Sequence, residues 1–120
     1  MHHSIKDLVV YQKALEISDL GWEIYTQVPR KFYQISGQFI TAVDSIGANI
    51  AEGYGRGSFK DRKNFLQISR GSLYETAFWL ERLTTRMLIR EEDADGLKNL
   101  LIKESILIMG YIKYLKSKIP

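Results

Sequence analysis

Four long segments of this 120-residue chain carry apolar residues at helical spacing, and no proline interrupts any of them. Proline occurs only at Pro29 and Pro120. Apolar residues that recur every three or four positions lie on one face of a helix. No segment of useful length alternates between apolar and polar residues with the period of two that a strand requires. The pattern therefore predicts an all-α fold.

The predicted helices are long, and short connections separate them. The first three span residues 7–28, 37–53 and 59–88, and the fourth begins at residue 91 and ends in the lysines of residues 113–118. We expect Asp7 to cap the first helix and Pro29 to end it, because the residue before a proline is pushed out of the α region. Residues 30–36 are predicted to form a loop. Such a chain is typical of an up-down-up-down antiparallel four-helix bundle, here one domain over residues 1–120.

The buried faces of the last two predicted helices can be read from the same spacing. In the third helix the stripe is Leu66, Leu73, Ala77, Leu80 and Met87. In the fourth helix it is Ala94, Leu97, Leu101, Ile108, Ile112 and Leu115. We expect these residues to form one core with the apolar faces of the first two helices.

The connection between the second and third predicted helices is rich in glycine. Residues 45–58 read SIGANIAEGYGRGS, with Gly53, Gly55 and Gly57 at alternate positions. A glycine inside a helix costs about 1 kcal/mol relative to alanine, but it suits a chain that leaves a helix with positive φ. Ser58 is a suitable N-cap for the next helix. We therefore predict that the second helix ends at Gly53 and that a tight turn leads to Ser58.

The helices carry more apolar and aromatic side chains than one bundle core holds. A bundle helix needs about three apolar positions in seven, and residues such as Trp22, Phe78, Tyr111 and Tyr114 exceed that number. One interpretation is that the aromatic rings lie flat on the surface. The other is a second apolar face buried between subunits, and on this ground we expect a homo-oligomer.

Composition excludes several kinds of site. The chain has no cysteine, so disulfides, thiolate metal sites and cysteine nucleophiles are excluded. Histidine occurs only at His2 and His3, and no metal-ligand spacing is present. No apolar run approaches the roughly 20 residues that span a bilayer, and the N-terminus lacks the apolar segment of a signal peptide. We expect a cytoplasmic protein with no metal, cofactor or membrane partner.

Several polar residues fall close to the apolar faces around the glycine-rich turn. They are Asn49, Glu52, Arg70, Ser72 and Glu75. We expect a hydrogen-bonded network that fixes helix register, because buried polar groups find partners. The alternative is an acid–base site that pairs Glu52 with Arg70 or Glu75. A carboxylate beside an arginine stays ionised, and Ser72 has no base besides a carboxylate, so we predict that the protein is not an enzyme.

The up-down topology gathers cations at one end of the bundle, although the net charge is only +3. That end, called the basic end below, carries Arg56, Lys60, Arg62, Lys63, Lys113, Lys116 and Lys118. The last three lie at a helix C-terminus, where the dipole favours cations. Lys60, Arg62 and Lys63 lie instead in the first turns of the third helix, where the dipole disfavours them.

Phosphate binding at a helix start would account for this placement. Tyr54 and Phe59 are available to stack on unpaired bases. The sequence therefore predicts that the basic end binds RNA or DNA. The alternative is a scaffold that recruits a partner protein, with the charge serving solubility.

The motifs around the turn resemble those of a known family. Asn49-Ile-Ala-Glu-Gly53, Tyr54-Gly-Arg56, Ser58 with Asp61, and Arg70-Gly-Ser72-Leu-Tyr-Glu75 resemble the four-helix-bundle proteins encoded in intervening sequences of bacterial 23S ribosomal RNA genes. The opening Asp7-Leu8 with Tyr11-Gln12-Lys13-Ala14 is similar to the start of that family. The chain departs from the family at Gly47, where proline is common, and at Thr41, where a basic residue is common.

The resemblance implies a four-helix bundle assembled as a ring-like homo-oligomer, a pentamer. A related branch of the family comprises accessory proteins of diversity-generating retroelements. Those proteins bind nucleic acid and a reverse transcriptase through a basic surface.

Overall fold

The computed structural model describes residues 4–120, so His2 and His3 lie outside the described part. The regular structure of residues 4–120 is entirely helical, which confirms the all-α prediction. The four long helices are α1 (Val9–Tyr25), α2 (Tyr33–Arg56), α3 (Phe59–Thr85) and α4 (Glu91–Lys118). Short 3-10 helices at Ile5–Asp7 and Arg30–Phe32 precede α1 and α2.

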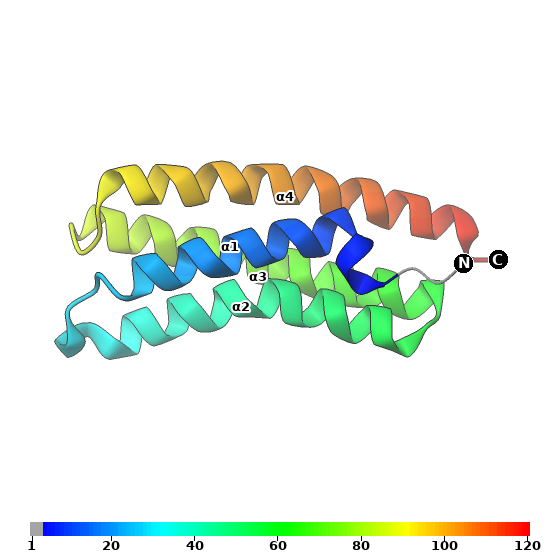
Figure 1. Ribbon diagram of the computed structural model, residues 1–120, viewed down its shortest axis with the longest axis horizontal. Coiled ribbons are helices and arrows are strands. Elements are labelled where there is room, and N and C mark those ends of the chain that lie inside the picture. Colours follow the sequence, from blue (N-terminus) through cyan, green and yellow to red (C-terminus); the bar gives the residue numbers. More distant parts are fainter. Residues whose placement is uncertain (1–3) are drawn as a thin grey trace.

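The four helices form an elongated antiparallel bundle. Figure 1 shows successive helices running in alternate directions along the longest axis, with an extent of 49 Å. The extensive contacts join α1 with α2, α2 with α3, α3 with α4 and α4 with α1. The beginning of α1, the C-terminus and the α2–α3 turn lie at the same end (Figure 1). This is the predicted up-down-up-down four-helix bundle.

The core consists of the faces that the apolar spacing predicts. Its fully buried side chains include Ile17, Ile24, Phe39, Val43, Ile46, Leu83, Leu97, Ile108 and Leu115. Met87 is the exception among the predicted core residues, because it is 88 % exposed. The reason is that α3 ends at Thr85, so Met87 lies in the following turn with a left-handed φ of 56°.

The beginning and end of α1 differ from the prediction. Asp7 does not cap α1; its carboxylate accepts a hydrogen bond from the Ser4 backbone at 3.0 Å and so closes the preceding 3-10 turn. The helix begins at Val9 and ends at Tyr25, three residues before the predicted Val28. Two further turn hydrogen bonds, from Gln27 to Ile24 and from Val28 to Tyr25, carry the chain on to the proline.

The loop predicted over residues 30–36 is wrong. The chain forms a 3-10 turn directly after Pro29, whose carbonyl accepts a hydrogen bond from the Phe32 backbone at 2.9 Å. The helix α2 then begins at Tyr33. Ser36 is buried in the first turn of α2, and its hydroxyl donates to the Tyr33 carbonyl at 3.3 Å. The polar and aromatic composition of residues 30–36 therefore did not indicate that they are helical.

The glycine-rich segment is helical for longer than predicted. The helix α2 continues through Gly53 and Gly55 to Arg56, and only Gly57 has a left-handed φ, of 84°. Gly53 is required for space instead, because a Cβ there would lie 2.8 Å from Phe65 Cβ and 3.2 Å from Arg62 Cα. The predicted end of α2 at Gly53 is thus wrong, and the turn is confined to Gly57 and Ser58.

Ser58 is the N-cap of α3, as predicted. Its hydroxyl oxygen accepts a hydrogen bond from the Asp61 backbone at 3.0 Å and its proton is donated to the Asp61 carboxylate at 2.8 Å. We expect Ser58→Ala to lower the free energy of unfolding by about 1 kcal/mol, measured by urea denaturation. Ser117→Ala, which removes an exposed hydroxyl near the end of α4, is the matched control and should change stability by much less. Equal losses in both variants would contradict the capping role.

Candidate nucleic-acid interface

The residues of the predicted basic end come from three helix termini that meet at one end of the bundle. The last turn of α2 supplies Arg56, and the first turns of α3 supply Lys60, Arg62 and Lys63. The last turns of α4 carry Lys113, Lys116 and Lys118. Figure 1 shows the α2–α3 turn and the C-terminus at the same end of the molecule. The predicted gathering of cations follows from this topology.

The two arginines of the basic end are stacked on aromatic rings. The guanidinium carbon of Arg62 lies 4.6 Å from the centre of the Tyr54 ring and 6.0 Å from that of Phe59. The guanidinium of Arg56 lies 4.9 Å from the Phe65 ring, and its Nε is 3.7 Å from a Glu52 oxygen. Such cation–π contacts stabilise the packing of the two helices. Arg56 and Arg62 therefore have a structural role at the turn.

The aromatic residues at the turn differ in exposure. Tyr54 is half-buried against Arg62, whereas the Phe59 side chain is 43 % exposed. Of the two rings that the sequence offers for base stacking, Phe59 is the one that the fold presents to solvent.

Among residues 4–120, the lysines of the basic end have no carboxylate partner. The ion pairs found within residues 4–120 join Lys13 with Glu16, Arg56 with Glu52, Arg82 with Glu81 and Arg90 with Asp93. Lys60, Lys113, Lys116 and Lys118 are exposed, and Lys63 is half-buried. Their ammonium groups are thus available to an external anion.

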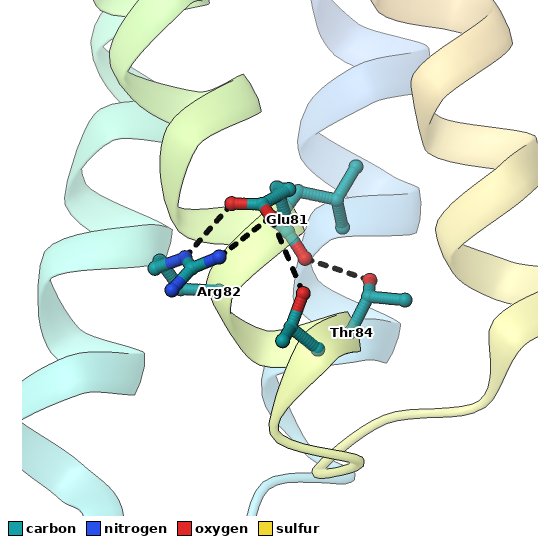
Figure 2. A network of polar contacts seen from close by, with 5 residues as sticks. Glu81, Arg82 and Thr84 are labelled. Atoms are coloured by element: carbon teal, nitrogen blue, oxygen red, sulfur yellow. Dashed lines mark hydrogen bonds and ion pairs between the residues drawn. The ribbon is translucent and has the colours of Figure 1, made fainter.

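Glu81 and Arg82, near the opposite end of α3, are paired with each other (Figure 2). Arg82 donates two hydrogen bonds to the Glu81 carboxylate, at 2.8 and 2.6 Å, and Thr85 donates a third at 3.2 Å. The hydrogen bond from Arg82 lowers the pKa of Glu81 and raises the pKa of Arg82. Nearby, Asp93 accepts hydrogen bonds from Gln27 and Arg90. Two groups of charged and polar side chains near this end are therefore held together within the chain.

The predicted polar network is not formed, because within residues 4–120 no hydrogen bond joins any two of its five side chains. Asn49 donates to the Ser45 carbonyl at 2.8 Å, Glu52 faces Arg56, and Glu75 accepts from Trp79 at 3.3 Å. The physical reason is helical phase. Arg70 and Glu75 are five positions apart, which places them about 140° apart around α3. Arg70 and Glu75 thus lie on different faces of α3, and Glu52 lies on α2.

One charged residue of the core was not predicted. Glu104 of α4 is fully buried, and neither carboxylate oxygen has a hydrogen-bond partner within residues 4–120. Burial raises the pKa of Glu104 to about 8; Lys13 on α1 opposes the rise and Glu16 adds to it. Lys13 is itself paired with Glu16 at 2.7 Å. The sequence did contain the signal, because Glu104 has the same helical spacing as Leu101 and Ile108.

Residues 4–120 offer neither a cluster of metal ligands nor a membrane-spanning helix. No group of three histidine, cysteine, aspartate or glutamate side chains there comes together as a potential metal site. Over the same residues, no helix combines the length and apolarity needed to cross a membrane.

Comparison with known proteins gives a consistent result. Residues 6–110 match the family of 23S rRNA-intervening sequence proteins. Among solved structures, a protein of unknown function from the S23 ribosomal protein family of Bacteroides thetaiotaomicron is 31 % identical, with a TM-score of 0.81. The match covers 88 % of this chain and 99 % of that protein. No curated protein matches the chain in sequence.

Proposed function

The chain belongs to the 23S rRNA-intervening sequence protein family, and on that premise we propose that it is a homo-oligomeric module that binds RNA or DNA phosphates through its basic end. The assembly is a ring, a pentamer, as the resemblance of its motifs implies. Each subunit adds one basic end, so the ring presents several of them on one side. The protein acts in the cytoplasm by binding and has no catalytic role.

The observation that carries the proposal is the pair Lys60 and Lys63 at the start of α3. Cations near a helix N-terminus are disfavoured by some tenths of a kcal/mol each, and neither lysine has a carboxylate partner among residues 4–120. A phosphate group would be favoured at this place by the dipole and by both ammonium groups. The placement is thus unfavourable for the free chain and favourable for a bound anion.

The chemistry of the basic end favours binding without strict sequence preference. Lysine contacts to phosphate fix position but carry no base information. The exposed ring of Phe59 is suited to stack on an unpaired base, and such stacking tolerates all bases. We therefore expect RNA with single-stranded loops to bind more tightly than a plain duplex of the same length.

The polar motif supports a role in binding over one in catalysis. Glu52 and Glu75 each contact a residue of their own helix, namely Arg56 and Trp79. Ser72, Glu52 and Glu75 do not converge on a shared hydrogen bond within the described residues. An acid–base pair acts on one shared reacting group, so the separate contacts of Glu52 and Glu75 are among the observations that favour binding.

The test is charge reversal at Lys60 and Lys63, which spares the stacked arginines. We expect K60E/K63E to weaken binding of a structured RNA fragment at least tenfold at low salt. The slope of log affinity against log salt concentration is negative. It should become shallower by about one for each phosphate that the variant no longer neutralises. The control is K31E/R86E, which makes the same change in charge near the opposite end and should bind like the wild type. Binding is measured by fluorescence anisotropy at salt concentrations from about 50 to about 300 mM, because affinity that depends on phosphate contacts falls steeply over this range.

Two outcomes would reject nucleic-acid binding. One is wild-type protein that ignores RNA and DNA even at low salt, which would favour the scaffold that recruits a partner protein. The other is equal loss of affinity in both double variants, because that would show attraction by net charge alone and not a site at the start of α3.

A further inference from the structure

The helix α3 has two partly exposed sides of different chemistry. One side, called the ridge below, carries Ile68, Ser72, Glu75 and Trp79 at successive helical positions, with Phe78 beside them. The other side carries Tyr74, Ala77 and Glu81, which line the contact with α4, and Arg70 lies about one turn before Tyr74 on the same side of the helix. The bundle core lies between the two sides, so one copy of the chain cannot bring them together.

The side that faces α4 is hollowed into an apolar groove. Its volume is about 510 Å³, and its apolar lining includes Leu73, Tyr74, Ala77, Leu80, Ile102 and Ile106. Three of these side chains are more than half exposed: Tyr74 at 57 %, Ile102 at 52 % and Ile106 at 68 %. An exposed apolar groove of this kind is typical of an interaction surface.

Arg70 lies next to this groove and is incompletely satisfied. Its guanidinium carbon is 5.6 Å from the ring centre of Tyr74, a groove residue. Its Nε is buried and has no hydrogen-bond acceptor within residues 4–120. A buried donor without an acceptor is destabilising, so Arg70 lacks an acceptor that the isolated bundle does not provide, although Glu81 and Asp95 line the groove.

The ridge offers the missing group. Glu75 is exposed, and its carboxylate accepts one long hydrogen bond, from Trp79 Nε1 at 3.3 Å. Ile68 and Phe78 lie on the ridge with 51 % and 54 % of their surface exposed. The ridge thus combines exposed apolar side chains with a carboxylate. The groove combines exposed apolar side chains with Arg70 beside Tyr74, and its lining also carries Glu81, Asp95 and Lys98.

We propose that the α3–α4 groove of one copy receives the ridge of the next copy, with Arg70 bonded to Glu75 of the partner subunit. This inference rests on the homo-oligomer of the proposed function and assigns its interface. The two surfaces are different parts of the same subunit, so the contact is head-to-tail and generates a closed ring if its rotation closes. The occupant is a second copy because the chain carries both complementary surfaces itself.

The experiment compares assembly masses by light scattering for the wild type, Arg70→Glu, Glu75→Arg and the double variant carrying both changes. We expect the wild type to have a mass several times that of the 13.9 kDa chain. Each single variant should lose the assembly, since it places like charges across the contact. The double variant should regain the wild-type mass because it restores an opposite-charge pair. Lys103→Glu, on an exposed position of α4, is the charge-change control and should assemble normally.

The outcomes separate this interface from the proposed function. The proposed interface and the proposed homo-oligomer both fail if the wild type is a monomer at every concentration. The interface alone fails if the ring persists in both single variants, and nucleic-acid binding by the ring then stands. It also fails if both single variants are monomers with wild-type helicity and melting temperature and the double variant does not reassemble.

Discussion

Glu104→Gln is expected to stabilise the bundle at alkaline pH by several kcal/mol and to remove the largest single source of pH dependence above pH 5. Glu104 is fully buried and neither carboxylate oxygen is hydrogen-bonded within residues 4–120. Burial of an unpaired charge is costly, so the folded protein keeps the carboxyl group protonated. The pKa is raised from 4.5 to about 8. Glutamine has almost the same shape and carries no charge at any pH.

The direction of the pH effect follows from proton linkage. Between pH 4.5 and about 8 the folded state holds a proton on Glu104 that the unfolded chain has already lost. This contribution to stability is therefore fully present below pH 4.5 and is lost as the pH rises towards 8. The slope approaches about 1.4 kcal/mol per pH unit, which gives an upper bound of about 5 kcal/mol over the interval.

Urea denaturation of wild type and Glu104→Gln from pH 4.5 to pH 9 measures this effect. The difference in unfolding free energy should be small at the acid limit and should grow towards pH 8. Glu16→Gln is an informative second variant, because it releases Lys13 from its 2.7 Å ion pair and removes a negative charge near Glu104. We expect it to lower the pKa of Glu104 and to flatten the wild-type curve. If the unfolding free energies of wild type and Glu104→Gln change with pH in parallel, the raised pKa of buried Glu104 is contradicted.

The contrast between Glu104 and its neighbours shows what the sequence could and could not predict. Helical spacing identified Leu101, Ile108 and Ile112 as buried, because burial of apolar surface determines which face of a helix points inward. The same spacing includes Glu104. Its charge excluded it from the predicted core, since buried charges are rare. Position in the helix was the better guide than residue type at this site.

The candidate site was predictable to the extent that topology determines it. An up-down chain places the α2–α3 turn and the C-terminus at one end, so Lys60 and Lys118 could be assigned to the same end from sequence. The contacts of each side chain were not predictable in this way. Whether Arg62 stacks on Tyr54, or Tyr74 faces α4, depends on the rotation of α3 against its neighbours. That rotation is set by packing, not by local sequence.

The glycines of the α2–α3 turn give the second large expected effect. Gly53→Ala should lower the free energy of unfolding by about 1–3 kcal/mol, the usual cost of overpacking. The added Cβ would lie 2.8 Å from Phe65 Cβ and 3.2 Å from Arg62 Cα, so neither contact can be relieved by moving the end of a flexible side chain. The loss should occur although alanine is the better helix former by about 1 kcal/mol.

Gly55→Ala is the matched control two residues further along the same helix. A Cβ at Gly55 meets nothing within 4 Å and the residue is helical, so the same substitution should raise stability by about 1 kcal/mol. Gly57→Ala should again be destabilising, by about 1–2 kcal/mol, because the φ of 84° is unfavourable for any residue with a Cβ. Urea denaturation of the three variants gives the order directly.

The two interpretations of Gly53 differ in whether alanine at Gly55 should have the same effect as alanine at Gly53. If Gly53 were needed only to end a helix, alanine at Gly53 and at Gly55 would have similar effects. If Gly53 is needed for close packing, Gly53→Ala also displaces the first turns of α3, where Lys63 and Arg62 lie next to Phe65. We therefore expect Gly53→Ala to weaken RNA binding at the basic end as well as stability, whereas Gly55→Ala should leave binding unchanged. If the Gly53→Ala protein is destabilised but binds RNA normally, the packing at Gly53 does not determine RNA binding at the basic end.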